Sequence, residues 1–221
     1  GKDQTAISCV KMLNGNLYVT ECLGLSGGYT DPVLDKISRL AKENNINTIL
    51  IEQNFGGGMF AELLKPFISR IHPCQIEDIR NNKTKELRII DTLEPVMNSH
   101  RLIIDRKVIE KDFRSNPQET PERRLKLQLV YQLSRISRHR GSLVHDDLVD
   151  SLAGAVAYWT DYMAQNEDLN MARRQDELLS IHTDNWNSLF NNTISQSAMG
   201  MNSQQIRNSN VSTDGFISDA Y

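Results

Sequence analysis

One apolar stretch constrains the fold of this chain more than any other feature, because it is typical of a strand buried on both faces. Residues 47–60 read NTILIEQNFGGGMF. A run of Thr, Ile, Leu and Ile without polar alternation is expected in the middle of a parallel sheet, where helices cover both faces. The stretch therefore predicts a parallel strand at residues 47–52 and an α/β fold around it.

Glu52 ends this strand, and a run of three glycines follows it. The carboxyl edge of a parallel sheet is where open α/β folds place their ligands. Glycines allow a tight turn there, or the close approach of a phosphate. The alternative is a solvated glutamate before a flexible turn. We expect Phe55 and Met59 to pack beneath the turn, which is made by Gly56, Gly57 and Gly58.

The segments around this strand predict a hairpin followed by alternating helices and strands. Asn14-Gly15 is a strong hairpin signal because both residues tolerate positive φ. We expect strands at residues 5–11, 16–23, 47–52, 73–79 and 101–105, and helices at residues 31–44, 59–71, 84–99 and 146–164, with a small helix after the last strand. A hairpin that leads into β–α–β units gives a mixed sheet flanked by helices.

Two helical segments carry more detailed expectations. The helix at residues 84–99 should turn its apolar side chains inward, and these are Leu87, Ile90, Leu93 and Val96. The sequence PERRLKLQLVYQLSRISRHR at residues 121–140 is typical of one long amphipathic helix. It is also basic, since residues 106–140 hold ten Lys and Arg against four Asp and Glu.

Composition divides the chain into two parts. Residues 1–165 have the apolar periodicity of a globular domain, whereas residues 166–221 are rich in Asn, Ser and Gln without such a period. We interpret the second part as a flexible tail whose only expected element is a short helix at MARRQDELL. The three cysteines, Cys9, Cys22 and Cys74, form no Cys-x-x-Cys pair, which favours reduced, buried thiols in a cytosolic protein. The chain also lacks a membrane-spanning run and a Walker A phosphate loop.

The local excess of positive charge predicts where phosphates bind. Arg135, Arg138 and Arg140 lie close together in this basic segment. Lys83, Lys85 and Arg88 have the spacing of a helix start and form a second candidate group. The alternative for both groups is a solvated, ion-paired helix face.

A second acidic cluster complements Glu52. Residues 144–152 read VHDDLVDSL, at the start of a helix with an apolar face. Asp146 or Asp147 alone is best explained as a helix cap. Two adjacent acids with Asp150 one turn later repel one another, and a bound cation is the usual reason to assemble them. Together with Glu52 they predict a carboxylate site for Mg²⁺ or Mn²⁺, with too little Cys and His to favour zinc.

These motifs resemble a known family. IEQNFGGGMFAELLKP, ELRIIDTLEP and HDDLVDSLAGAVAYW look like the C-terminal nuclease domain of the large terminase subunit of T7-like tailed bacteriophages, over roughly residues 1–160. The resemblance implies a ribonuclease H-like fold and a metal-dependent endonuclease that cuts concatemeric double-stranded DNA during genome packaging, through two-metal phosphodiester hydrolysis. Carried over by position, Glu52 matches the second carboxylate of the family, Asp147 the third, Asp146 the adjacent acid and His145 the residue before them.

The N-terminus departs from the family pattern. The opening GKDQTA matches the end of a pattern with two Asp residues, so that Asp3 aligns with the second and the first is expected before Gly1. The chain is then expected to be a fragment with impaired cleavage, from which the N-terminal ATPase domain is also missing. The resemblance further implies the capsid portal protein and the small terminase subunit as partners, no membrane, and a location in the host cytoplasm at the portal.

Two alternatives remain open. A resolvase-type nuclease of the same fold would use the same carboxylate chemistry. A DNA-gripping and portal-docking module that does not cleave in this truncated form would explain the expected loss of the first Asp.

Overall fold

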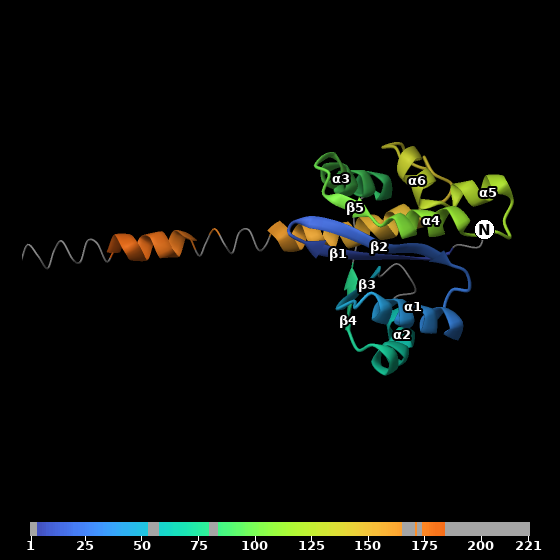
Figure 1. Ribbon diagram of the computed structural model, residues 1–221, viewed down its shortest axis with the longest axis horizontal. Coiled ribbons are helices and arrows are strands. Elements are labelled where there is room, and N and C mark those ends of the chain that lie inside the picture. Colours follow the sequence, from blue (N-terminus) through green and yellow to red (C-terminus); the bar gives the residue numbers. More distant parts are fainter. Residues whose placement is uncertain (1–3, 53–57, 80–83, 165–170, 172–173, 184–221) are drawn as a thin grey trace, which may run out of the picture. The chain divides into compact units, whose positions relative to one another are not determined.

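The computed structural model describes residues 4–52, 58–79, 84–164, 171 and 174–183 (Figure 1). The chain divides into two compact units, Gly1–Ala164 and Gln165–Tyr221. In the second unit, residues 174–183 are helical. Most of the expected tail, residues 184–221 included, lies outside the described residues.

An N-terminal hairpin forms the centre of the first unit. Strands β1 (Thr5–Leu13) and β2 (Asn16–Leu25) pair antiparallel, and β5 (Leu102–Ile104) adds to β2 in parallel. The turn residues Asn14 and Gly15 both have positive φ, 52° and 76°. This geometry matches the twist of the flanking strands and confirms the hairpin predicted from Asn-Gly.

The stretch NTILIE forms a parallel strand as expected, but only Ile51 is fully buried, so the expected burial on both faces is incomplete. Strand β3 (Thr48–Glu52) pairs in parallel with β4 (Gln75–Ile79), and helix α2 (Met59–Ile71) connects them. Glu52 is the last residue of β3, opposite Ile79. Within the described residues the strands are hydrogen-bonded in two groups, β1-β2-β5 and β3-β4, which together contain both parallel and antiparallel pairs.

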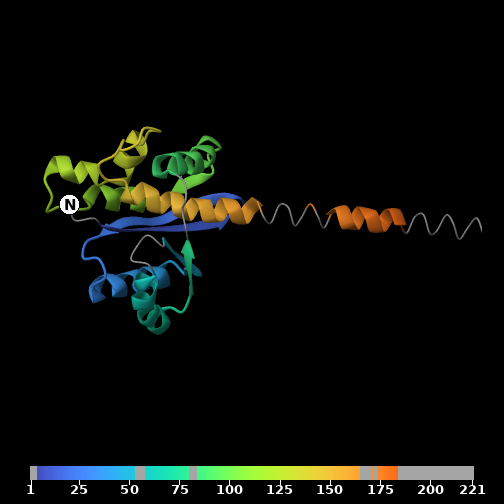
Figure 2. The ribbon, with the colours of Figure 1, turned by 180° about the vertical axis from the view of Figure 1, so that it is seen from behind.

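Helices cover the hairpin on both faces, which confirms the predicted α/β class. Helices α1 and α2 lie on one side of β1 and β2, and α3 to α6 lie on the other, in the front view and from behind (Figures 1 and 2). Besides α2, the bounds are α1 (Asp31–Glu43), α3 (Lys85–Asn98), α4 (Arg106–Arg114), α5 (Pro121–Lys126) and α6 (Leu129–Arg135). A further helix spans residues 147–164 in the described part of the chain.

Each face of the hairpin has its own core. One core joins β1 and β2 to α3, α4, α6 and the helix of residues 147–164; the other joins the opposite face to α1, α2, β3 and β4. Trp159 ties the last helix to β1, because its indole N–H donates to the carbonyl of Val10 at 3.0 Å. Among the described residues, no helix is both long and apolar enough to cross a membrane.

The prediction of one long basic helix at residues 121–140 is wrong. The segment contains two short helices, α5 and α6, separated by Gln128 in an extended conformation. The break is stabilised from outside the segment. The carboxylate of Asp112, at the end of α4, accepts hydrogen bonds from the first two backbone N–H groups of α6, at 2.9 and 3.2 Å. These donors would otherwise be unsatisfied at a buried helix start.

The buried face of α3 is the predicted one at Leu93 and Val96, but it is rotated in the first turns of the helix. Glu86, Ile89, Leu93 and Val96 are buried, whereas Leu87 is exposed. This rotation turns the basic side chains at positions 85 and 88 toward the acids of the last helix. The expected inward position of Leu87 is therefore wrong.

Candidate metal and phosphate site

Glu52 reaches the candidate site from the carboxyl end of β3. Its side chain is 36% exposed and therefore accessible to a ligand. Of the three glycines after it, Gly56 and Gly57 lie outside the described residues, as does Phe55. Gly58 precedes α2 with a left-handed φ of 90°, a conformation that glycine adopts without strain.

The acids of the second cluster lie at the start of the last helix. Asp147 is the first helical residue, and the backbone N–H of Asp150 bonds to the carbonyl of Asp146 at 2.9 Å. Leu148, Val149 and Leu152 are buried on the same turns and hold the helix against the hairpin. The acids therefore project from a firmly packed element.

Helix α3 places two cations among these acids. The Lys85 ammonium lies 2.8 Å from Asp146 Oδ1 and 3.2 Å from Asp150 Oδ2. The Arg88 guanidinium, through Nη2, lies 2.5 Å from Asp150 Oδ1 and 3.8 Å from Glu52 Oε1. The structure thus brings Glu52, Asp146 and Asp150 into one ion-pair network, although β3 and the last helix are far apart in the sequence.

The electrostatics of the network follow from partial burial. Burial raises the pKa of Asp150, against the lowering effect of Lys85 and Arg88, and the nearby Glu52 charge adds to the increase. For Lys85, burial lowers the pKa, but the hydrogen bond to Asp146 and the charge of Asp150 outweigh it, so that its pKa is raised. The ammonium is therefore held in its charged form.

The other predicted residues have different surroundings. Asp3 and Lys83 lie outside the described residues, and His145 is half-buried just before the acidic pair. Arg138 pairs with Asp91 and Glu94 on the exposed side of α3, at 3.4 and 3.2 Å. Arg135 lies over the Tyr131 ring, and Arg140 lies near enough to Glu86 to lower its pKa. These three arginines are thus separate from the Lys85 and Arg88 network.

Sequence reasoning missed the direct pairing of Lys85 and Arg88 with the acids, and it gave Asp150 only a supporting role. A signal for the pairing was present. Lys85 and Arg88 are three residues apart, and Asp146 and Asp150 four apart, so each pair occupies one face of its helix. Two helices with opposite charges at one-turn spacing are candidates for a mutual contact, but only the fold shows that they are neighbours.

The donor chemistry of the network fits a hard divalent cation. Carboxylate oxygens are the ligands that Mg²⁺ and Mn²⁺ prefer. Lys85 Nζ already lies within hydrogen-bond distance of two carboxylates from one helix face. In the described part of the chain, however, no group of three or more His, Cys, Asp or Glu side chains is arranged to hold a metal ion.

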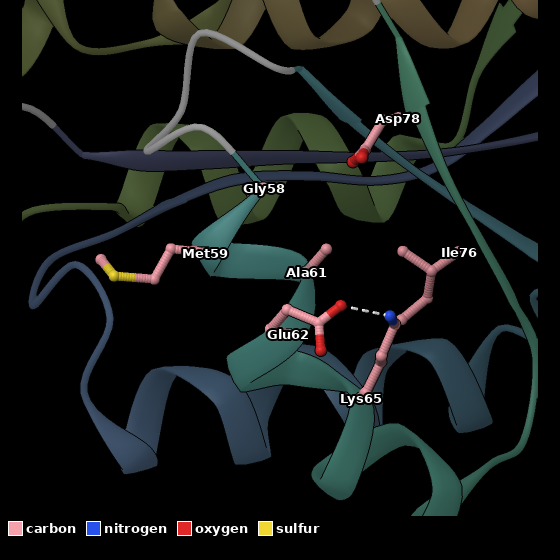
Figure 3. Close-up of a pocket in the computed structure, with 7 residues that line it drawn as sticks. All are labelled: Gly58, Met59, Ala61, Glu62, Lys65, Ile76 and Asp78. Atoms are coloured by element: carbon pink, nitrogen blue, oxygen red, sulfur yellow. Dashed lines mark hydrogen bonds and ion pairs between the residues drawn. The ribbon is translucent and has the colours of Figure 1, made fainter.

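A hollow of about 480 Å³ lies beside α2 and β4 (Figure 3). Glu62 and Lys65 pair along its wall, and Asp78 extends from β4. Met59 lines the hollow and is 50% exposed, so the expectation that it packs in the core is wrong. Apart from Gly58, the lining contains none of the predicted site residues: it consists of Gly58, Met59, Ala61, Glu62, Lys65, Ile76 and Asp78.

The fold agrees with the family whose sequence pattern this chain matches. Residues 1–102 match the family model described as "Terminase Bacteriophage T7, Ribonuclease H-like domain". Residues 1–102 are thus a ribonuclease H-like domain of the T7 terminase type. The match includes β3 with Glu52 and both α3 cations.

A relative extends the likeness beyond the family match. The chain is 35% identical over 179 residues to the protein named "Terminase, large subunit" of Enterobacteria phage T3. The alignment covers 81% of this chain and 30% of the relative, so the chain spans less than a third of the relative's length.

Proposed function

We propose that the chain is the endonuclease domain of a viral genome-packaging terminase, which cuts concatemeric double-stranded DNA with divalent metal ions. The observation that carries the proposal is the position of Arg88, between Glu52 at the end of β3 and Asp150 on the last helix. Acids from two distant segments meet there, at the sheet edge where α/β folds bind ligands. The family match and the named relative support the nuclease class.

Each group in the site has a role that its chemistry allows. Glu52, Asp146 and Asp147 are the proposed metal ligands, Asp3 a fourth, and Asp150 supports them. Mg²⁺ or Mn²⁺, as two ions, would activate water and stabilise the leaving oxygen of a phosphodiester. His145 orients a neighbour or contacts a phosphate.

The basic groups are proposed to hold the DNA. Arg135, Arg138 and Arg140 contact phosphates of the duplex on one side, and Lys83, Lys85 and Arg88 contact phosphates nearer the acids. Such contacts carry no sequence preference but position the scissile bond. Arg138 is exposed, and its surface pairs with Asp91 and Glu94 contribute little and are readily exchanged for phosphate.

The wider assembly is part of the same proposal. The named relative is a large terminase subunit, and this chain aligns with 30% of it. We propose that the domain works beside an ATPase domain of the same polypeptide, with the small terminase subunit and the capsid portal protein as partners, in the host cytoplasm.

Nicking of supercoiled plasmid DNA in Mn²⁺ tests the proposal, with the 221-residue chain and with an N-terminally extended polypeptide. Glu52→Gln and Asp147→Asn should each reduce nicking by on the order of 100-fold or more. Such a loss exceeds the one that is typical when a residue that only orients a metal ligand is replaced. Matched controls are Glu43→Gln and Asp161→Asn, which change exposed acids on α1 and on the last helix and should nick like wild type.

The same assay separates the alternatives. Wild-type rates in Glu52→Gln or Asp147→Asn would exclude the metal role. Tight DNA binding without nicking, in both the 221-residue and the extended proteins, would favour the DNA-gripping module. Cleavage confined to four-way junctions would favour a resolvase-type nuclease.

A further inference from the structure

Two basic side chains, Lys85 and Arg88, lie among the acids of the network. There they neutralise negative charge that a bound metal cation would otherwise neutralise. Arg88 and Asp150 are both largely buried, each with only 12% of its side chain exposed. Lys85 is more open, at 40% exposed, and contacts two acids at once. Buried acids of like charge repel strongly unless a cation lies among them. In the metal-free protein, Lys85 and Arg88 provide that charge.

The geometry of Arg88 differs from that of a pair optimised for stability. A structural Arg–carboxylate pair is usually bidentate, with two parallel N–H···O bonds. Here a single nitrogen, Nη2, lies toward both Asp150 and Glu52, at 2.5 and 3.8 Å. Within the described residues, the Nε–H of Arg88 is buried without a hydrogen-bond partner. An unsatisfied buried donor is costly, so this arrangement does not maximise the stability of the pair itself.

We propose that Lys85 and Arg88 are intramolecular counter-ions, which neutralise the acid network in the metal-free protein and compete with divalent cations for it. This inference rests on the proposed metal-dependent nuclease function. It adds a mechanism that regulates when metal ions bind at the site. Divalent cations must displace the two side chains from Asp146, Asp150 and Glu52. The displaced side chains then become available for DNA phosphates, which favours metal loading when DNA is present.

Binding of Mn²⁺ alone to the 221-residue chain tests the competition without any catalytic readout. Free Mn²⁺ is followed by electron paramagnetic resonance, and binding is confirmed by titration calorimetry. Lys85→Met and Arg88→Met keep most of the side-chain volume but remove the charge. Each should tighten Mn²⁺ binding by at least about tenfold, because a unit positive charge a few ångströms from the ion is removed.

Two further variants serve as controls. Arg88→Lys keeps the charge and should bind Mn²⁺ within a few-fold of wild type. Arg106→Met removes a charge from the exposed face of α4, where the arginine is 91% exposed, and should leave Mn²⁺ binding unchanged. Circular dichroism checks that each variant folds. If Arg88→Met does not fold, Mn²⁺ binding to Lys85→Met decides the test, because Lys85 is more exposed.

The outcomes separate this inference from the proposed function. If wild type binds Mn²⁺ and both Met variants bind it equally or more weakly, the counter-ion role is overturned while the metal site stands. If neither wild type nor any variant binds Mn²⁺, the metal site fails, and the competition fails with it. If Arg106→Met tightens Mn²⁺ binding as much as the Lys85 and Arg88 variants do, the effect is due to the net charge of the protein. That result would also overturn the inference.

Discussion

At the scale of single residues, buried polar contacts of α3 show how side chains on neighbouring positions serve different purposes. Lys85 and Arg88 pair with the acids, whereas Glu86 accepts a hydrogen bond from the backbone N–H of Gly141 at 2.6 Å. Gly141 has a positive φ of 71°, which glycine adopts without strain. Glu86 thus fastens the loop that follows the basic segment to α3.

Glu86 should make the stability of the protein depend on pH in the acid range. The Gly141 hydrogen bond, with help from Arg140, lowers the pKa of Glu86 below its ordinary value of 4.5. The ionised form therefore stabilises the folded state above that value, and this contribution is lost as the pH falls through the lower folded-state pKa. Glu86→Gln should be less stable than wild type at neutral pH, and the difference should narrow in acid.

Urea midpoints measured across this pH range check the prediction. The exposed Glu43→Gln on α1 is the matched control and should follow wild type at every pH. A deficit of Glu86→Gln that is constant with pH would mean that lost packing, rather than the charge, is responsible.

At the scale of elements, the short helix α6 and the loop after it form the basic surface proposed to hold DNA. Arg135 lies in the last turn of α6, and Arg138 and Arg140 follow it. The break between α5 and α6 determines where these side chains lie. It depends on Asp112, a buried residue that caps α6 from the end of α4.

Neutralising the three arginines should weaken DNA binding in a salt-dependent way. If Arg135, Arg138 and Arg140 each contact one phosphate, the triple Gln variant should flatten the slope of log affinity against log salt by roughly 3 × 0.9 units. Fluorescence anisotropy on a short duplex, over a series of salt concentrations, measures the slope.

The matched control removes the same charge from the other side of the hairpin. Lys36, Arg39 and Lys42 are exposed on α1, which lies across the sheet from α6 (Figure 1). Their triple Gln variant should retain the wild-type slope. Equal flattening of the slope in both triple variants would mean that DNA binding depends on the net charge of the protein and not on this surface.

At the scale of the whole molecule, the two compact units suggest separate duties. The first unit contains both cores and the acid network. The second carries seven acids against three arginines, which disfavours a contribution to DNA binding. We expect it to be the segment that attaches to the capsid portal.

Deleting residues 166–221 should therefore separate the two activities. Nicking in Mn²⁺ and the urea midpoint of the remaining chain should stay at wild-type values. The same deletion, made in a polypeptide that includes the proposed ATPase domain, should abolish DNA packaging into purified procapsids. A large loss of stability on deletion would show that the second unit completes the fold of the first. Undiminished packaging would contradict the portal role.

Local interactions made much of the secondary structure predictable from the sequence. The Asn14-Gly15 turn, the start of α1 at Asp31-Pro32 and the apolar run of β3 each depend on residues within a few positions of one another. Backbone preferences and apolar periodicity act at that range, which is why these elements form where the sequence predicts them. The motifs also indicated the family, which the comparison then confirmed.

Only the tertiary structure decided the features that depend on distant neighbours. Residues 121–140 have the pattern of one helix, yet Asp112 stabilises a break within them by satisfying the backbone donors of α6. Lys85 and Arg88 look like a phosphate-binding helix start, yet the fold places them against Asp146, Asp150 and Glu52. Charge attraction between segments is decided by which elements the cores bring together, and a linear pattern does not contain that information.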